Sequence, residues 1–324
     1  MYGLNLGMSK YLGSTLLFLC LGLLFQTADA QVLVKRQLTK MGSLFDITVV
    51  ARDSIQADQH IQNAANEIER IENLISEWRP HTQIAQVNQY AGISPVQVDK
   101  EVFELTRRAI QYSQLTDGAF DISIAALDKV WVFDGSMEEL PSDDAIRNSV
   151  QYVGYQYIAL DSVNTTIFLE KKGMKIGFGS IGKGYAADKG RELLQSLGIQ
   201  GGIINASGDL STWGAQPGRQ LWKVGVRNPF KPHKMIKVLK LGYGSVATSG
   251  SYEKFAELHG KRYAHIINPI TGWPSTGLTS VTVSGQSAEF ANFLSTSIMV
   301  LGNKKGKKLL KNFADYKAII VKDK

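Results

Sequence analysis

The spacing of apolar residues beyond position 30 predicts an alternation of strands and amphipathic helices. Segments 31–40 and 44–51 are predicted to be strands, and the second is rich in β-branched residues. A long helix is predicted from the capping residues Asp53 and Ser54 to about Glu77. Its buried face is predicted from apolar residues that recur at helical spacing, namely Ile55, Ile61, Ala65, Ile68, Ile71 and Ile75.

Farther along the chain, a second helix is predicted from Asp99 to Gln114, and turn residues at 116–118 end it. Short strands are predicted over 157–160, 166–169, 174–178, 202–206, 222–227 and 279–284, and helices over 181–197 and 289–301. No repeat, low-complexity stretch or linker divides these elements, and they do not follow a regular βαβ rhythm. The pattern therefore favours a single α+β domain over residues 31–324, with mixed or antiparallel sheets flanked by helices, over a doubly wound parallel fold.

The first 30 residues have the three-part pattern of a secretory signal peptide. Lys10 precedes an apolar run from Leu12 to Phe25, and Ala28 and Ala30 are small residues at the positions that a signal peptidase recognises. We expect cleavage before residue 31 and therefore an exported protein. An uncleaved membrane anchor is the alternative reading, although the apolar run is short for a membrane span. The single cysteine lies in this segment, at position 20, so the predicted mature chain has no disulfide and no thiolate metal site.

The chain carries a net charge of +7, and its lysines and arginines are scattered apart from a lysine run at 304–311. Such a run is typical of a solvated helix face. A basic protein can bind nucleic acid, an anionic membrane or an anionic ligand. No motif supports nucleic-acid binding or a structural role, so the charge alone leaves the ligand open.

A glycine-rich segment at 177–184 carries the first chemical signal. Gly177, Gly179 and Gly182 match a dinucleotide-binding pattern, but no acidic residue follows at the end of the next strand to hold a ribose. The same segment resembles a phosphate-binding P-loop, except that Gly184 stands where a magnesium-binding Ser or Thr is required. Glycines before a helix, together with Lys183, can nevertheless cradle a phosphate or pyrophosphate. A tight turn packed against the core is the alternative interpretation.

Four further islands are rich in polar and glycine residues, at 116–121, 205–209, 247–253 and 265–272. Such residues also form turns, but loops are where binding and catalytic sites are built. His265 lies beside two isoleucines, so it is either a buried, hydrogen-bonded histidine or a general base that works near neutral pH. No pair of histidines has zinc-ligand spacing.

These islands, in this order, resemble the ApbE family of FAD:protein FMN transferases, and the resemblance covers nearly all of the chain beyond residue 30. It rests on Met41-Gly42-Ser43, Ser76-Glu77-Trp78-Arg79-Pro80, Asp117-Gly118-Ala119-Phe120-Asp121, the segment 181–188, Asn205-Ala206-Ser207-Gly208-Asp209, Thr248-Ser249-Gly250, the segment 265–272 and Ser295-Thr296. Each motif alone is common, whereas the ordered set is specific.

The resemblance implies an ApbE-like, T-fold-like architecture and an enzyme that takes FAD as substrate and needs Mg²⁺. The residues implied at the FAD site are Met41, Trp78, Ala119, Phe120, Asp121, Gly177, Lys183 and Ile267, with Lys183 at the pyrophosphate. The implied metal site comprises Ser180, through its carbonyl, and Asn292, Ser295 and Thr296. His265 is the implied general base.

Three positions depart from the family pattern. Gly177, Asn268 and Asn292 stand where the family usually has aspartate. An asparagine can still offer a carbonyl oxygen to a hard cation, but the lost charge is expected to weaken magnesium binding. The departures therefore concern the metal site more than FAD binding.

The implied reaction is the transfer of FMN from FAD to a Thr or Ser hydroxyl of an acceptor protein, with a phosphoester product and release of AMP. The acceptors would be flavoproteins such as subunits of membrane redox pumps, and the enzyme would work in the periplasm or on the outer side of the inner membrane. Two other functions remain open: an FAD-binding or scavenging protein with a degraded metal site, and an FAD pyrophosphatase that yields FMN and AMP.

Overall fold

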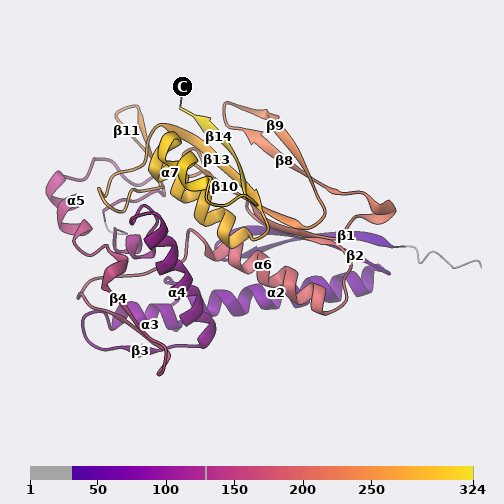
Figure 1. Cartoon of the computed structure of the whole chain (residues 1–324), viewed down its shortest axis with the longest axis horizontal. Coiled ribbons are helices and arrows are strands. Elements are labelled where there is room, and N and C mark those ends of the chain that lie inside the picture. The colour runs from indigo at the N-terminus through magenta and orange to yellow at the C-terminus, as the bar shows by residue number, and fades with distance from the viewer. Residues whose placement is uncertain (1–30, 128–129, 324) are drawn as a thin grey trace, which may run out of the picture.

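The computed structural model describes residues 31–127 and 130–323, so the predicted signal peptide lies outside the described residues. Its centre is a seven-stranded antiparallel sheet with the order β1-β2-β6-β7-β10-β13-β14 (Figure 1). The strands of this sheet are β1 (Val32–Lys40), β2 (Ser43–Ala51), β6 (Gly202–Ala206), β7 (Asp209–Trp213), β10 (Gly244–Gly250), β13 (Leu278–Gly285) and β14 (Lys317–Lys322). The predicted α+β class with antiparallel sheets is thus confirmed.

The first two strands form a hairpin whose register pairs Lys40 with Ser43. The two residues between them, Met41 and Gly42, both have positive φ angles, of 51° and 63°. Positive φ at both central positions is the geometry of the tight turn that matches the twist of antiparallel strands. The backbone N–H of Met41 donates to the carboxylate of Glu72, which fixes this turn beside the following helix.

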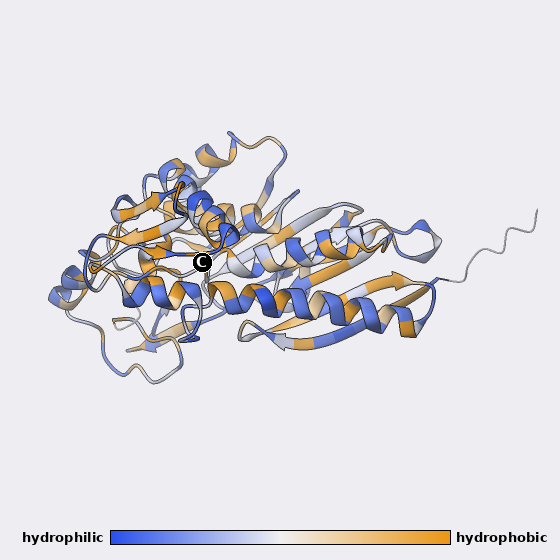
Figure 2. Cartoon of the chain, turned by 90° about the horizontal axis from the view of Figure 1, so that it is seen from below, coloured by the Kyte–Doolittle hydropathy of each residue, from blue (hydrophilic) through white to orange (hydrophobic). Residues whose placement is uncertain are grey.

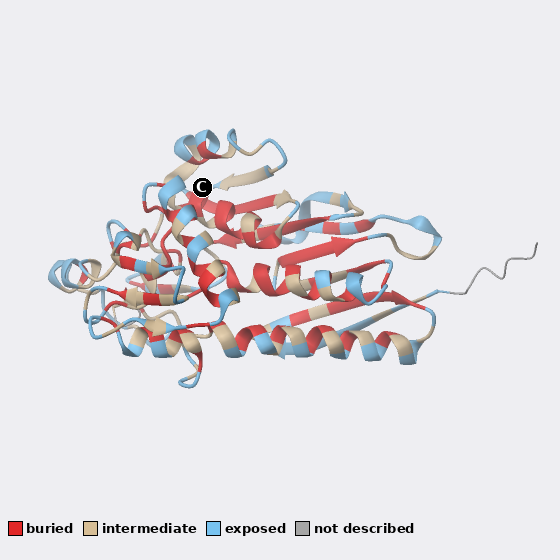
Figure 3. Cartoon of the chain, turned by 60° about the horizontal axis from the view of Figure 1, so that its bottom comes forward, coloured by how far each residue is buried: buried red, intermediate tan, exposed pale blue. Residues whose placement is uncertain are grey.

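Three helices cover one face of the sheet: α2 (Ser54–Ile75), α6 (Gly182–Ser196) and α7 (Ala288–Leu310). Asp53 caps α2 by accepting from the backbone N–H of Gln56, as its position before the apolar stripe predicts. Seen from below, α2 alternates between polar and apolar residues (Figure 2), and its buried residues face the sheet (Figure 3). Ile55 is the exception in the predicted stripe, because it lies in the first turn and is 83% exposed.

The opposite face of the sheet carries a two-stranded ribbon, β8 (Trp222–Asn228) and β9 (Lys231–Leu241), which lies apart from the helices (Figure 1). The remaining elements surround the ends of the three helices. They are α3 (Gln83–Gln89), β3 (Val96–Gln97), α4 (Lys100–Leu115), η1 (Ile122–Leu127), α5 (Asp143–Val150), η2 (Tyr155–Tyr157), β4 (Ile158–Asp161), β5 (Thr166–Leu169), η3 (Pro217–Arg219), β11 (Phe255–Leu258) and β12 (Lys261–Ala264).

The strand predicted over 174–178 is wrong, because this segment is irregular. Its backbone is held by a side chain instead of a neighbouring strand: the amide of Asn88 both accepts from the N–H of Ile176 and donates to its carbonyl. The N–H of Gly177 then donates to the carbonyl of Ile122. The segment is as buried as a strand, which explains its apolar sequence, but it has no sheet to join.

The C-terminal helix is longer than predicted. It runs to Leu310 across a break at Gly302, where φ is 74°. The lysines at 304, 305, 307 and 308 are exposed on this last part, which confirms the solvated helix face.

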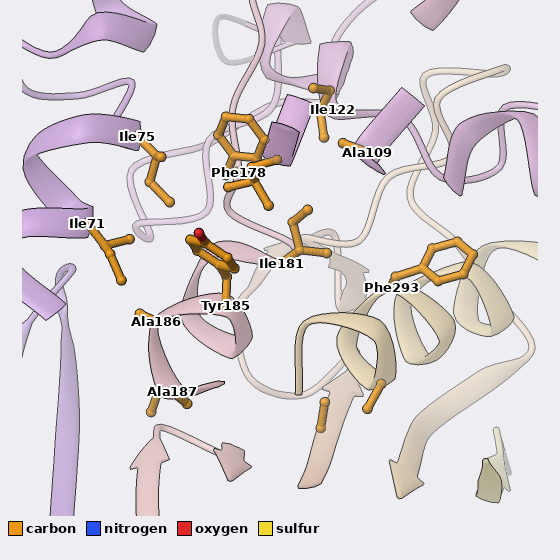
Figure 4. Packing of buried hydrophobic residues seen from close by; sticks show 14 of the residues in the cluster. Ile71, Ile75, Ala109, Ile122, Phe178, Ile181, Tyr185, Ala186, Ala187 and Phe293 are labelled. Carbon is orange, nitrogen blue, oxygen red and sulfur yellow. The ribbon is translucent and has the colours of Figure 1, made fainter. Parts of the chain in front are cut away.

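One apolar core joins the sheet to the helices. Phe178 lies between Ile75 of α2 and Ile122 of η1, and Ile181 lies near Tyr185 of α6 (Figure 4). The glycine-rich segment therefore lies on the core, at the start of α6. Among residues 31–127 and 130–323, no helix is long and apolar enough to cross a membrane.

Candidate active site

The site is built around the start of α6, where the glycine-rich segment ends. The N-cap residue Ile181 makes no side-chain capping bond, and the N–H of Gly182 donates to the carbonyl of Phe178. The backbone N–H groups of Lys183 and Gly184 therefore remain for a ligand. A Cβ at Gly179 would meet nothing within 4 Å, whereas one at Gly184 would lie 2.5 Å from the carbonyl oxygen of Ala288. The tight-packing interpretation therefore holds at Gly184, which lets α6 and α7 pack closely. Gly179 faces open space, and the phosphate cradle stays a prediction.

Lys183 projects from the first turn of α6 toward a buried carboxylate. Its Nζ lies 3.6 Å from Oδ2 of Asp209, the first residue of β7, whose side chain is only 4% exposed. Burial raises the pKa of Asp209, while Lys183, the amide of Asn292 and the backbone N–H of Thr248 partly offset that rise. Lys183, at the N-terminus of α6, is therefore paired with Asp209, whose ionised form is destabilised by burial.

The charge of Lys183 also affects a second carboxyl group, that of Glu253. Burial of the carboxyl group raises the pKa of Glu253 to about 7, and the Lys183 charge opposes this rise while that of Asp209 reinforces it. The residue as a whole is exposed to solvent. No role was predicted for Asp209 or Glu253, although both lie in the polar islands at 205–209 and 247–253.

Hydroxyl groups of β10 and α7 meet beside Asn292. Oγ of Ser249 lies 2.8 Å from Oγ of Ser295 and 3.2 Å from Oγ1 of Thr296. Ser295 is fully buried and also donates to the carbonyl of Asn292. Three of the four residues predicted at the metal site therefore lie together on one turn of α7. Ser180, the fourth, is half-buried in the glycine-rich segment, three positions before Lys183.

His265 lies in a bend after β12, not in the short strand that its apolar neighbours suggest. Its Nδ1 is 3.0 Å from the carbonyl oxygen of Lys254. Because a carbonyl can only accept, Nδ1 carries the proton and Nε2 keeps a free lone pair. Burial lowers the pKa of His265, and the charges of Lys254 and Lys183 lower it further, against the opposing effect of the Lys254 carbonyl. A neutral imidazole with a free Nε2 is the form that a general base requires.

Aromatic residues support the His265 bend. Phe133 contacts the imidazole edge-on at a centroid distance of 6.4 Å, and Trp131 stacks on Phe133 and on Tyr263. The indole N–H of Trp131 donates to the carbonyl of Gly272, at the end of the following turn. These rings come from segments far apart in sequence, so no local pattern could have placed them around His265.

The segment 119–121 adjoins the glycine-rich segment, because the N–H of Gly177 donates to the carbonyl of Ile122. Two of its side chains contact other parts of the protein. Phe120 packs edge-on against Tyr112 and Phe293 in the core. The carboxylate of Asp121 accepts from the backbone N–H and hydroxyl of Ser123 and from the N–H of Tyr155. Contact of Ala119, Phe120 and Asp121 with FAD remains a prediction.

The position of Gly177 has a structural explanation. A Cβ at this residue would lie 2.7 Å from Oε1 of Glu77, so the Glu77 carboxyl group occupies the space that a side chain at 177 would need. Trp78, next to Glu77, is 76% exposed. The Met41 methyl group comes 3.5 Å from a Cβ built at Gly182. Met41 and Trp78 therefore both border the glycine-rich segment, whereas Ile267 forms an isolated bridge to Pro274 in the turn after His265.

A separate hollow of about 630 Å³ lies between α2, α4 and α6. It is lined mainly by charged residues that pair with one another, such as Arg70 with Glu101 at 2.7 Å. None of the predicted site residues lines it.

The donor set beside Lys183 suits a hard cation. The carbonyl of Ser180, the hydroxyl of Thr296, the amide oxygen of Asn292 and the carboxylate of Asp209 are all oxygen ligands, and Mg²⁺ is usually held by one or two carboxylates together with substrate phosphates. No group of three or more His, Cys, Asp or Glu residues suited to a metal occurs in the described parts of the chain. The oxygen atoms of these residues would suit a hard cation such as Mg²⁺ that a phosphate substrate also holds.

Comparisons with known proteins agree with this geometry. The ApbE family model matches residues 41–320. A Klebsiella pneumoniae protein named FAD:protein FMN transferase is 32% identical over 283 residues, which cover 87% of this chain and 86% of that protein. A Treponema pallidum protein of the same name is 29% identical over 300 residues, which cover 87% and 82%.

Solved structures show the same fold. The ApbE protein of Thermotoga maritima superimposes with a TM-score of 0.83 at 31% identity, covering 90% of this chain and 94% of that one. The flavinyl transferase ApbE of Pseudomonas stutzeri gives 0.80 at 27% identity, covering 91% and 92%. By the family model, the sequence identity and the shared fold, this chain belongs to the ApbE family.

Proposed function

We propose that this protein is an FAD:protein FMN transferase that moves FMN from FAD to a Thr or Ser hydroxyl of an acceptor protein. The observation that carries the proposal is the pairing of Lys183, at the open start of α6, with the buried carboxylate of Asp209. The charge of Lys183 also lowers the pKa of His265. The names of the relatives support the same activity.

In the proposed reaction, the acceptor hydroxyl oxygen attacks the phosphorus on the FMN side of the FAD pyrophosphate. The new bond joins that oxygen to phosphorus, and the bond from phosphorus to the bridging oxygen breaks, so AMP leaves with the bridging oxygen. Nε2 of His265 accepts the hydroxyl proton, which is the role that its free lone pair allows. Phosphoryl transfer otherwise depends mainly on positioning and charge stabilisation.

Lys183 and the first N–H groups of α6 would hold the pyrophosphate charge. We propose that Mg²⁺ is held by Ser180, Asn292 and Thr296 together with Asp209, and that it neutralises charge on the phosphate oxygens when bound. The Ser295 hydroxyl, which is already shared between Ser249 and the Asn292 carbonyl, would position this set from beneath. Trp78 offers an exposed indole on which the flavin or the adenine could stack.

We further propose that the protein works outside the cytoplasm on an exported or membrane-bound flavoprotein. The support is the signal-peptide pattern of residues 1–30.

The decisive experiment compares residues 31–324 with their His265→Ala variant in the presence of FAD, Mg²⁺ and a threonine-containing acceptor domain. A general base contributes roughly 10²–10⁴-fold in rate. The variant should therefore lose that factor in acceptor flavin fluorescence and in AMP release, while it keeps its FAD affinity, because the proposed role of the imidazole is to accept the acceptor proton and not to hold the flavin.

Unchanged transfer by the variant would remove His265 from the mechanism. The products that the wild type forms from FAD distinguish the two other functions. Free FMN and AMP without a labelled acceptor would identify a pyrophosphatase, and tight FAD binding without either product would identify a flavin-binding protein.

A further inference from the structure

The net charge of the protein is concentrated in one segment. Residues 210–252 contain no aspartate or glutamate but seven cationic residues: Arg219, Lys223, Arg227, Lys231, Lys234, Lys237 and Lys240. Since the net charge of the whole chain is +7, the positive and negative side chains outside this segment are equal in number. Six of the seven lie on the β8–β9 ribbon.

The inner face of the ribbon is fixed to the sheet. Val224 packs against Leu210 of β7 and Val246 of β10. The indole N–H of Trp222 donates to the carbonyl of Trp213 at the base of the ribbon. The ribbon is therefore part of the rigid fold, and its outer face is presented in a fixed orientation.

The outer face has an apolar centre between cations. The register pairs Lys223 with Lys240, Gly225 with Val238, and Arg227 with Met235. The Met235 side chain lies over Gly225, because a Cβ there would be 2.5 Å from its sulfur. Met235 is 63% exposed and Val238 is 47% exposed. Apolar residues surrounded by charged ones are the usual composition of a protein interface.

The ribbon cations have no carboxylate partners among the described residues, because none of the ion pairs found there includes a cation of residues 210–252. Several cations of the helical side are paired, as Arg70 is with Glu67 and Glu101. The ribbon therefore projects an uncompensated positive field, which can raise the association rate of an anionic partner by about 10–10³-fold.

The ribbon and the active site share strand β10. Val224 of the ribbon packs against Val246 of this strand. Ser249, three residues farther along β10, has its hydroxyl oxygen 2.8 Å from that of Ser295 and 3.2 Å from that of Thr296, both residues of the predicted metal site. The ribbon is therefore joined to the site through one strand.

We propose that the outer face of the β8–β9 ribbon docks an acidic surface of the acceptor protein and so directs the acceptor hydroxyl toward His265. This inference rests on the proposed transferase function. A protein partner fits better than an anionic membrane, because the ribbon is joined to the site through β10 and only the acceptor must reach that site. The field would speed the encounter, and Met235 and Val238 would supply the apolar contact.

The test measures docking separately from transfer. The probes are two dye-labelled threonine peptides of equal length, one flanked by glutamates and the other by glutamines, and binding is followed by fluorescence anisotropy. The ribbon variant combines Lys223→Glu, Lys231→Glu, Lys234→Glu and Lys240→Glu and leaves Arg227 in place. The matched control combines Lys304→Glu, Lys305→Glu, Lys307→Glu and Lys308→Glu on the exposed part of α7, which changes the net charge equally.

We expect the wild type and the α7 variant to bind the acidic peptide about tenfold or more tightly than the glutamine peptide at low salt, with the preference lost at high salt. The ribbon variant should lose the preference while it keeps its FAD affinity and its thermal unfolding midpoint. Equal affinity for both peptides, or an equal loss in both variants, would overturn the proposal.

A membrane role would appear as sedimentation with phosphatidylglycerol vesicles that the ribbon variant loses, without any peptide preference, and it too would overturn the proposal. If the wild type prefers the acidic peptide but transfers no FMN, the result supports the docking surface and refutes the transferase function.

Discussion

Two buried aspartates that pair with cations of α6 have opposite characters. Asp188 lies on the helix, and its carboxylate is 3.1 Å from Arg191, whose side chain is only 4% exposed. It also accepts from the hydroxyls of Ser211 and Ser287 and from the backbone N–H of Glu289. Asp209 lies 3.6 Å from Lys183, whose side chain is 28% exposed. The Asp188 region joins α6, β7 and α7, whereas the Asp209 region opens toward solvent.

The difference shows how one helix can serve both as scaffold and as binding site. A buried carboxylate that is fully bonded stabilises the arrangement of its partners. A buried carboxylate with a raised pKa is costly to ionise in the free protein, and a bound cation would stabilise its ionised form. Only the second kind is suited to binding substrate.

The largest effect on stability is expected from Asp188→Ala. The change leaves Arg191 buried without its carboxylate, and loss of one partner of a buried pair typically costs about 3–5 kcal/mol in the free energy of unfolding. Urea unfolding would measure it, with transfer per folded molecule unchanged. A loss below ~1 kcal/mol would show that the Gln286 carbonyl, which also accepts from Arg191, satisfies the guanidinium by itself.

The matched change, Asp209→Asn, should act on function and not on folding. Because the folded pKa of Asp209 is raised above its ordinary value, the ionised group disfavours folding at neutral pH, and its removal should leave the free energy of unfolding equal or higher. The Mg²⁺ concentration for half-maximal transfer should rise about 10–100-fold, as is typical when a group that supports a metal site is removed. An unchanged Mg²⁺ requirement would separate Asp209 from the metal.

The smallest effect is expected from pH. The pKa of His265 is lowered below its ordinary value of 6.5, so Nε2 stays free as the pH falls to that value, and transfer should decline only at lower pH. Rate measured at saturating FAD between pH 5 and 8 tests this. Glu253, with a pKa of about 7, is the group that could be confused with it. The decline of the transfer rate at low pH should persist in Glu253→Gln. If it disappears in that variant, the decline belongs to Glu253 and not to His265.

Local pattern was sufficient for the long elements. The α2 stripe, the Asp53 cap and the strands of the β1–β2 hairpin follow from periodicity and capping, because each depends on residues close in sequence. The motif order was sufficient to identify the family. The local pattern did not predict the structure of residues 174–178. This buried apolar segment is hydrogen-bonded to the side chain of Asn88 and not to a neighbouring strand.

The sequence by itself determined the class of fold, the family and the identity of most residues that surround the start of α6. Only the tertiary structure decided which of them share one environment: Asp209 beside Lys183 and Asn292, and Trp131 and Phe133 around the His265 bend. It also gathered the cations of β8 and β9 on one ribbon, which packs against strand β10. The reason is physical, because burial and charge depend on neighbours brought together across the fold, and these neighbours set both pKa values and the shape of a docking surface.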